Sequence, residues 1–210
     1  MEFTLVDKCV NLVAKRNSGK SILLKWLVSQ QKDEFDKIFC VCPTEKVAPF
    51  YRDFVPENCV FDNYSEQWTM KLIEQMTKSK ADNKKRKVLL IFDDITTDVN
   101  LAQSKSFKIL YSRGRHLGIS VIITQQFLHS LPPICRTNCD YCLVGQMNQA
   151  SVEILADSYL SGGLNRQEFY QLYNDNTKDY NFLIINNNSS KHNSPTEIYG
   201  SIKTPHGFVD

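Results

Sequence analysis

The sequence predicts an α/β fold, a three-layer sandwich in which helices cover both faces of a mainly parallel central sheet. Continuous apolar runs of β-type residues recur along the 210 residues, and helical patterns separate them. Unbroken apolar runs are typical of strands that are buried on both faces, as in a parallel sheet. Strands that alternate with helices indicate a layered α/β architecture.

The first expected strand, residues 10–13, passes through a short polar loop into a helix that begins near Lys20. Further strands are expected at residues 37–42, 59–61, 88–92, 119–123 and 141–144. Helical patterns between them begin at or near Ser65, Leu101, Asn148 and Asn165. Two last apolar runs, residues 182–185 and 198–202, flank a loop rich in Asn and Ser and predict a C-terminal hairpin.

The chain length suits one domain over residues 1–210, with a C-terminal extension from about residue 177. No window approaches the ~18 consecutive apolar residues of a membrane helix, so we expect no membrane insertion. The sequence shows no basic start followed by an apolar core, the pattern of a signal peptide, so we expect none. The seven cysteines are odd in number, and several lie in apolar runs. This pattern indicates reduced core thiols in an intracellular protein.

The net charge of +2 is too small to indicate a nucleic-acid partner, but the basic residues are unevenly distributed. Six of them cluster in one stretch, interrupted by a single acid: Lys78, Lys80, Lys84, Lys85, Arg86 and Lys87. Such a run is usually a solvated loop. The functional alternative is contact with the phosphate backbone of a nucleic acid, which needs clustered positive charge.

The segment AKRNSGKS, residues 14–21, lies between the first strand and the first helix. It matches the phosphate-loop (P-loop) pattern G-x-x-x-x-G-K-[ST], with Ala14 at the position of the first glycine. Backbone N–H groups and the helix N-terminus attract phosphate oxygens. Lys20 can reach the outer phosphates, and the Ser21 hydroxyl can ligate Mg²⁺. The alternative is a Gly-Lys-Ser that only begins an amphipathic helix.

The strand at residues 88–92 ends in two acids, Asp93 and Asp94. In a P-loop enzyme, Asp93 would hold Mg²⁺ against the Ser21 hydroxyl, and Asp94 would polarise the water that attacks the γ-phosphate. A polar residue after the next strand can lie between these acids and the γ-phosphate. We choose Gln125 for this sensor position, because Thr124 is expected to finish the strand. The alternatives are a solvated Asp-Asp turn and an ordinary loop glutamine.

Arg113 and Arg115 flank Gly114 just before the strand at residues 119–123. An arginine supplied to a transferring phosphoryl group can raise the rate by about 10³- to 10⁵-fold. Two arginines at such a break could reach the nucleotide of a neighbouring subunit, or they could form surface salt bridges. Cys135, Cys139 and Cys142, with His129 upstream, could form a Cys₃His zinc site, although their spacing is irregular for one.

Three segments in this order, AKRNSGKS, LLIFDD and YSRGRHLGISVIITQQ, resemble the poxvirus-type genome-packaging ATPases of large eukaryotic DNA viruses and virophages. This family belongs to the FtsK–HerA superfamily of P-loop ATPases. The resemblance implies a core strand order of 5-1-4-3-2 and ATP hydrolysis, with Mg²⁺, that drives double-stranded DNA into a preformed capsid. It also implies a homo-oligomeric ring, a pentamer or hexamer, docked on a viral capsid or membrane protein at the packaging vertex. The location implied is the viral factory in the host cytoplasm, and also the virion.

The resemblance also implies roles for individual residues. Asp93 would bind the metal ion together with Ser21, and Asp94 would polarise the attacking water. Gln125 would be the sensor. Arg115 would act on the nucleotide of the neighbouring subunit, with Arg113 as the second choice. The ATP-binding residues would be Ala14, Lys15, Arg16, Asn17, Ser18, Gly19, Lys20, Ser21 and Ile22. Two other functions stay open: a small P-loop nucleoside or nucleotide kinase, and a nucleotide-binding assembly protein without turnover.

Overall fold

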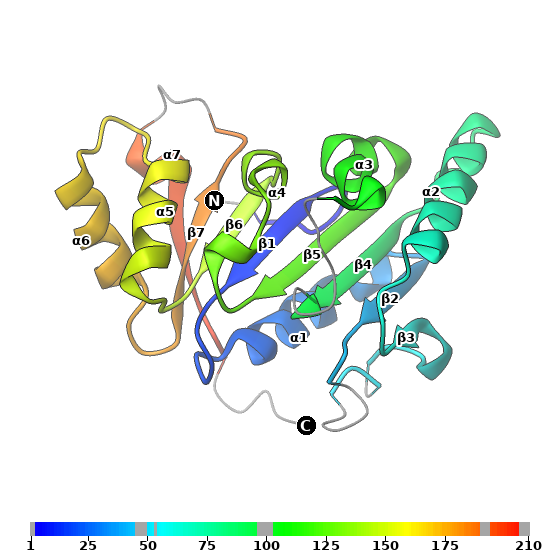
Figure 1. The fold of residues 1–210 in the computed structure, drawn as a ribbon, viewed down its shortest axis with the longest axis horizontal. Helices are drawn as coiled ribbons and strands as arrows, with labels where there is room; N and C mark the ends of the chain where they lie inside the picture. The colour runs from blue at the N-terminus through cyan, green and yellow to red at the C-terminus, as the bar shows by residue number, and fades with distance from the viewer. Residues whose placement is uncertain (1–2, 45–49, 53, 96–102, 190–193, 206–210) are drawn as a thin grey trace.

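The computed structural model describes residues 3–44, 50–52, 54–95, 103–189 and 194–205. These residues contain one eight-stranded sheet of order β3-β2-β4-β5-β1-β6-β7-β8 (Figure 1). The strands are β1 (Cys9–Val13), β2 (Lys37–Val41), β3 (Val60–Phe61), β4 (Val88–Asp93), β5 (Ile119–Gln125), β6 (Tyr141–Val144), β7 (Asn181–Asn186) and β8 (Tyr199–Lys203). The α-helices are α1 (Lys20–Gln31), α2 (Glu66–Ala81), α3 (Lys105–Arg113), α4 (Pro133–Thr137), α5 (Gln149–Tyr159), α6 (Arg166–Asn176) and α7 (Pro195–Ile198).

The six strands β3, β2, β4, β5, β1 and β6, in the order of the sheet, pair in parallel. Strand β7 pairs antiparallel with both β6 and β8. If the strand before the P-loop is counted first, the expected core order 5-1-4-3-2 corresponds to β6-β1-β5-β4-β2. This is the observed order, with β3 added at one edge. The predicted mainly parallel sheet and the C-terminal hairpin are therefore both confirmed.

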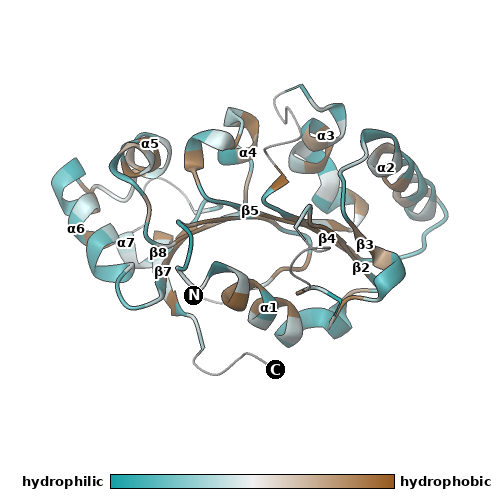
Figure 2. Ribbon diagram, turned by 60° about the horizontal axis from the view of Figure 1, so that its bottom comes forward, coloured by the Kyte–Doolittle hydropathy of each residue, from teal (hydrophilic) through white to brown (hydrophobic). Residues whose placement is uncertain are grey.

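Helices cover both faces of the sheet, which gives the predicted three layers. Helix α1 lies against one face, and α2, α3, α4 and α5 lie over the other (Figure 2). Because strand side chains alternate between faces, β1 contributes to two cores. Val10 and Leu12 join the core that contains α1, and Cys9 and Val13 join the opposite core. All five residues of β1 are buried, as the continuous apolar run predicts.

The helix starts follow the polar residues expected at them. Ser65, Asn148 and Asn165 each accept a hydrogen bond from a backbone N–H in the first turn of the helix that follows. Helix α3 begins at Lys105 behind the cap Ser104, and the predicted start at Leu101 lies outside the described residues. These caps satisfy N–H groups that would otherwise lack partners at the helix N-termini.

One strand end differs from the prediction. Strand β5 does not end near Ile123 but continues to Gln125. The last two residues stay in the sheet because Thr124 pairs with Leu12 and Gln125 with Val13 in the parallel register. Thr124 was expected to finish the strand, but Gln125 also belongs to it and is buried, and the sequence pattern missed Gln125 because it follows apolar residues.

All seven cysteines are buried and unbridged, in agreement with reduced core thiols. Across the described helices, none is long and apolar enough to cross a membrane.

Gly118 ends the 3₁₀ turn η4 (Gly114–Leu117) with a φ of 73°. A Cβ at this position would lie 2.2 Å from the backbone oxygen of Arg86, in the loop that precedes β4. Gly163 provides a matched control, because its φ is 77° and a Cβ there would meet nothing within 4 Å. Only the steric contact therefore distinguishes the two positions.

We expect Gly163→Ala to lower the free energy of unfolding by about 1–2 kcal/mol, the cost of left-handed backbone in a residue with a Cβ. Gly118→Ala should lower it by clearly more, because the Arg86 carbonyl must also move. Urea unfolding of both variants measures this difference. Equal losses would contradict the packing of η4 against residue 86.

Candidate active site

The P-loop connects the end of β1 to the start of α1 at the carboxyl edge of the parallel strands. Backbone hydrogen bonds hold its first residues to both neighbouring strands: Ala14 N–H donates to Gln125 O at 3.1 Å, and Lys15 N–H donates to Gln146 O at 2.8 Å. Gly19 precedes the first residue of α1 with a φ of 83°, a conformation that favours glycine. Hydrogen bonds thus fix the start of the loop, and its end continues directly into the N-terminus of α1.

Ala14, which replaces the first glycine of the P-loop pattern, is fully buried. A Cβ on Gly145, which follows β6, would lie 2.9 Å from the Ala14 Cβ and 2.8 Å from the Phe182 ring. The absence of a side chain at Gly145 therefore leaves room for the methyl group of Ala14. This compensation explains how the P-loop tolerates alanine at its first position.

The P-loop residues 15–22 line a pocket of about 370 Å³ together with Thr44, Asp93, Asp94 and Gln126. Eight of the nine residues expected to bind the nucleotide therefore border one cavity, and the ninth, Ala14, is buried and does not border it. Both expected acids border the same cavity. Thr44 follows β2 and was not predicted, because a lone threonine in a loop carries no recognisable signal.

Burial lowers the pKa of Lys20, and the nearby carboxylates of Asp93 and Asp94 oppose this shift by favouring the charged amine. The Lys20 side chain thus lies in a poorly solvated place where a further negative charge would stabilise it. A bound triphosphate would supply that charge. The electrostatics of the pocket therefore suit an anion next to Lys20.

Side chains at the ends of β4 and β5 are joined by hydrogen bonds at the carboxyl edge of the sheet. The Asp93 carboxylate accepts a hydrogen bond from the Thr124 hydroxyl, and the Cys42 thiol donates to its other oxygen at 3.7 Å. Asp94 has a φ of 52°, and its carboxylate accepts a hydrogen bond from Gln126 Nε2 at 2.5 Å. The two acids are therefore held in different orientations by different partners, which permits different roles.

The structure does not place Gln125, the predicted sensor, in the pocket. Gln125 is 1% exposed and is absent from the residues that border the cavity. Side chains alternate along β5, so Gln125 points to the face opposite that of Thr124. Gln126 borders the cavity, and its side chain donates a hydrogen bond to Asp94. We therefore revise the proposed sensor from Gln125 to Gln126, one residue beyond the strand.

Arg115 lies at the amino edge of the sheet, beside the start of β1, β5 and β6. Its guanidinium contacts Asp140 Oδ1 at 3.0 Å, and Lys8 Nζ lies 3.6 Å from the same oxygen. Asp140 is 1% exposed, whereas the Arg115 side chain is 42% exposed. Arg113 is exposed at the end of α3. Neither arginine can therefore reach the P-loop of its own subunit, which is at the opposite edge of the sheet.

Part of the basic run lies on the same edge as Arg115. The side chain of Lys80 donates to the backbone oxygen of His116. A surface pocket there is lined by Asp7, Lys80, Asn83, Lys84, Lys85, Arg86, Lys87, Arg115, His116, Leu117 and Gly118. We call its seven Lys, Arg and His residues the basic edge. Folding thus joins two segments of positive charge that are separate in the sequence.

Oxygen ligands suited to Mg²⁺ are present in the site: the Ser21 hydroxyl and the Asp93 carboxylate border the same pocket. Over the described ranges, no group of three or more His, Cys, Asp or Glu side chains could hold a metal ion. In particular, the thiol of Cys139 contacts the Tyr159 hydroxyl at 3.3 Å in the core.

Together, the fold and this pocket define a P-loop nucleotide-binding domain. Within that class, the chain belongs to the poxvirus A32 protein family, whose model matches residues 4–196. It is 28% identical over 182 residues to uncharacterized protein 075L of Invertebrate iridescent virus 6, covering 85% of this chain and 70% of that protein. It is 25% identical over 205 residues to uncharacterized protein L437 of Acanthamoeba polyphaga mimivirus, covering 89% and 71% respectively.

Among solved structures, the fold is similar to B204, the DNA-packaging ATPase from Sulfolobus turreted icosahedral virus. The TM-score is 0.72 at 18% identity, over 97% of this chain and all of that one. The genome-packaging NTPase B204 of Sulfolobus turreted icosahedral virus 2, in complex with ATP-γS, gives a TM-score of 0.67 at 20% identity, over 94% and 97% of the two chains. These likenesses confirm the P-loop ATPase fold.

The revised sensor gives a prediction. Gln126→Ala should lower ATP turnover by about 10²-fold, the usual loss when a positioned hydrogen-bond donor is removed from an active site. Nucleotide affinity should change little, because Gln126 contacts Asp94 rather than the loop that holds the phosphates. Gln125→Ala, as the matched control, should lower the melting temperature but keep turnover in the folded protein. Single-turnover hydrolysis would contradict the revision if Gln125→Ala abolished it and Gln126→Ala did not.

Proposed function

We propose that this chain is the ATPase of a viral genome-packaging motor, which hydrolyses ATP to drive double-stranded DNA into a preformed capsid. The observation that carries the proposal is one pocket in which Lys20 of the P-loop faces the paired acids Asp93 and Asp94. Membership of the poxvirus A32 family supports it. So does the fold shared with two proteins that are named as packaging enzymes.

In this proposal each pocket residue has one task. The P-loop backbone and Lys20 bind the phosphates, and Ser21 with Asp93 would hold Mg²⁺. The metal ion would neutralise the charge that develops on the transferring phosphoryl group. Asp94 orients the attacking water and accepts its proton, and Gln126 fixes the Asp94 carboxylate through their hydrogen bond. Thr124 plays the corresponding part for Asp93.

This arrangement favours hydrolysis over the two alternative functions. A small kinase transfers phosphate to a second substrate and has no need of a second acid fixed by a glutamine. A binding protein without turnover needs neither Asp94 nor Gln126 at the pocket. The Asp94–Gln126 pair is therefore the feature that a water-activating enzyme explains best.

The remaining parts of the proposal concern partners. We assign double-stranded DNA as the translocated substrate and a homo-oligomeric ring, a pentamer or hexamer, as the active form. The lysine-rich part of the basic edge, Lys80 and residues 84–87, supplies the clustered positive charge that a duplex backbone requires. The ring would dock on a capsid or membrane protein at the packaging vertex, within the viral factory in the host cytoplasm.

Lys20→Ala tests the ATPase assignment. Hydrolysis should fall by at least about 10²-fold, because the amine that stabilises the outer phosphates is lost. The fold should keep its melting temperature, because burial already disfavours the charged form of Lys20 in the nucleotide-free protein. Lys32→Ala, at the exposed end of α1, is the control and should hydrolyse ATP like the parent. Equal rates for Lys20→Ala and Lys32→Ala would exclude the proposed site.

A mixing experiment tests whether an arginine acts between subunits. Arg115→Ala and Lys20→Ala should each be inactive alone, the first for want of the neighbour's arginine and the second for want of its own lysine. Mixed together, some interfaces would combine an intact P-loop with an intact arginine, so phosphate release should partly return. Full inactivity at every mixing ratio, with subunit exchange verified, would contradict action between subunits.

The ion pair of Arg115 with buried Asp140 requires a control in this experiment. Arg115→Ala leaves that carboxylate with Lys8 and the Cys9 N–H as partners, so its melting temperature must be compared with that of the parent. Arg113→Ala, which breaks no described ion pair, is mixed with Lys20→Ala in parallel. If Arg113→Ala shows the rescue and Arg115→Ala is active alone, Arg113 is the residue that acts.

A further inference from the structure

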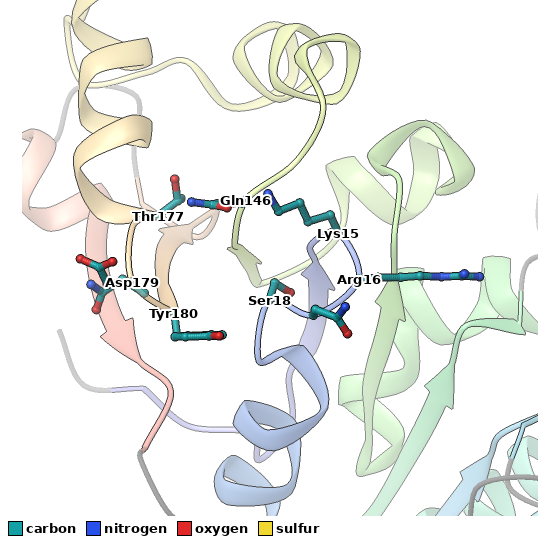
Figure 3. Close-up of a pocket in the computed structure, with 9 residues that line it drawn as sticks. Lys15, Arg16, Ser18, Gln146, Thr177, Asp179 and Tyr180 are labelled. Carbon is teal, nitrogen blue, oxygen red and sulfur yellow. The ribbon is translucent and has the colours of Figure 1, made fainter.

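A second pocket, of about 380 Å³, lies on the other side of the P-loop (Figure 3). Residues 15–18 border both pockets. The far wall of the second pocket consists of Gln146, which follows β6, of Thr177, Asp179 and Tyr180 in the turn between α6 and β7, and of Asn181, the first residue of β7. The two pockets therefore meet at the P-loop, and one extended ligand could occupy both.

The α6–β7 turn is packed directly on the P-loop. A Cβ on Gly19 would lie 3.2 Å from Tyr180 Cδ1 and 2.9 Å from the Thr204 hydroxyl oxygen. Thr204 N–H also donates to Tyr180 O at 3.0 Å, which ties the turn to the residue just after β8. The C-terminal hairpin thus contributes a wall beside the nucleotide site and not only two further strands.

Two features of this pocket point to a ligand. The Tyr180 side chain is 53% exposed, one of two large hydrophobic side chains that stay exposed in the described parts of the chain. In Figure 3 its ring extends from the turn toward Ser18. The Ser18 hydroxyl is buried and has no hydrogen-bond partner among the described residues. The exposed Tyr180 and the residue with the unsatisfied hydroxyl, Ser18, therefore line the same pocket.

The two pockets differ in chemistry. The first contains Lys20, Ser21 and the two acids, the groups that suit a triphosphate with its metal ion. The second is lined by the Tyr180 ring and by the polar residues Gln146, Asp179 and Asn181, of which Asn181 Nδ2 already donates to Lys178 O at 2.9 Å. Amides and a carboxylate can bond to ribose hydroxyls or to the edge of a base, and a ring can stack on its face. The second pocket therefore suits the nucleoside part of a nucleotide.

We propose that the second pocket holds the nucleoside of the bound nucleotide, with the base stacked on Tyr180. This inference rests on the proposed function, because it takes the triphosphate to lie in the P-loop. Stacking accepts every base, so Tyr180 should contribute equally to the binding of ATP and GTP. The loss of one stacked base corresponds to about a 5- to 150-fold loss of affinity.

The test compares two probes that share phosphates but not a base: a non-hydrolysable ATP analogue and inorganic tripolyphosphate, each with Mg²⁺. Tyr180→Asn removes the ring, and asparagine tolerates the φ of 61° at this position. We expect its Kd for the ATP analogue to rise about 5- to 150-fold and its Kd for tripolyphosphate to stay that of the parent. Tyr180→Phe, which keeps the ring, and Lys178→Ala, in the same turn but outside the pocket, should bind both probes normally.

Each other outcome has a distinct meaning. If Tyr180→Asn binds the ATP analogue like the parent, the inference is overturned. If it loses both probes equally, Tyr180 only supports the P-loop through its contact with Gly19, and the inference is again overturned. If the parent binds neither probe, the proposed function fails as well, which separates that failure from the other two.

Discussion

The pairing of β1 with β5 on one side and β6 on the other is the contact on which the site depends. It places the P-loop between two strand ends, and both flanking segments accept hydrogen bonds from its first residues, through Gln125 O and Gln146 O. Because these strands run parallel, their carboxyl ends meet at one edge of the sheet. The nucleotide pocket, the two acids and the proposed nucleoside pocket all lie at this edge. A one-residue shift of β1 would turn every one of its side chains to the other face.

Close packing at this edge explains both the one departure from the P-loop pattern and the need for its remaining glycine. Ala14 fits because Gly145 has no side chain, and Gly19 is required both by its positive φ and by the nearness of Thr204 and Tyr180. The C-terminal hairpin therefore constrains the loop from one side, and the ends of β4 and β5 constrain it from the other. The P-loop is positioned by contacts with segments that are more than 100 residues away in the sequence, through Gln125, Gln146 and Thr204.

Most of the fold could be predicted from the sequence, because the strands of a buried parallel sheet are continuous apolar runs and because helix caps are local signals. The sequence also predicted the P-loop and the paired acids, which are contiguous motifs. The sequence-based prediction failed where a residue's role depends on the direction of its side chain or on contacts with residues far away in the sequence. Gln125 and Gln126 are adjacent in the chain, and only the structure shows that Gln125 is buried in β5 whereas Gln126 lies just beyond it and contacts Asp94. No local pattern indicates that Tyr180 packs against Gly19, or that Asp140 binds Arg115.

We propose that this chain hydrolyses ATP at the interfaces of a ring that acts on duplex DNA. The most direct test measures the ATPase rate per subunit across a range of protein concentrations, with and without double-stranded DNA. If the claim is right, the rate per subunit should rise with protein concentration, because the site is completed by a neighbour, and duplex DNA should raise it further. A rate per subunit that is independent of concentration and unaffected by duplex DNA would contradict the claim.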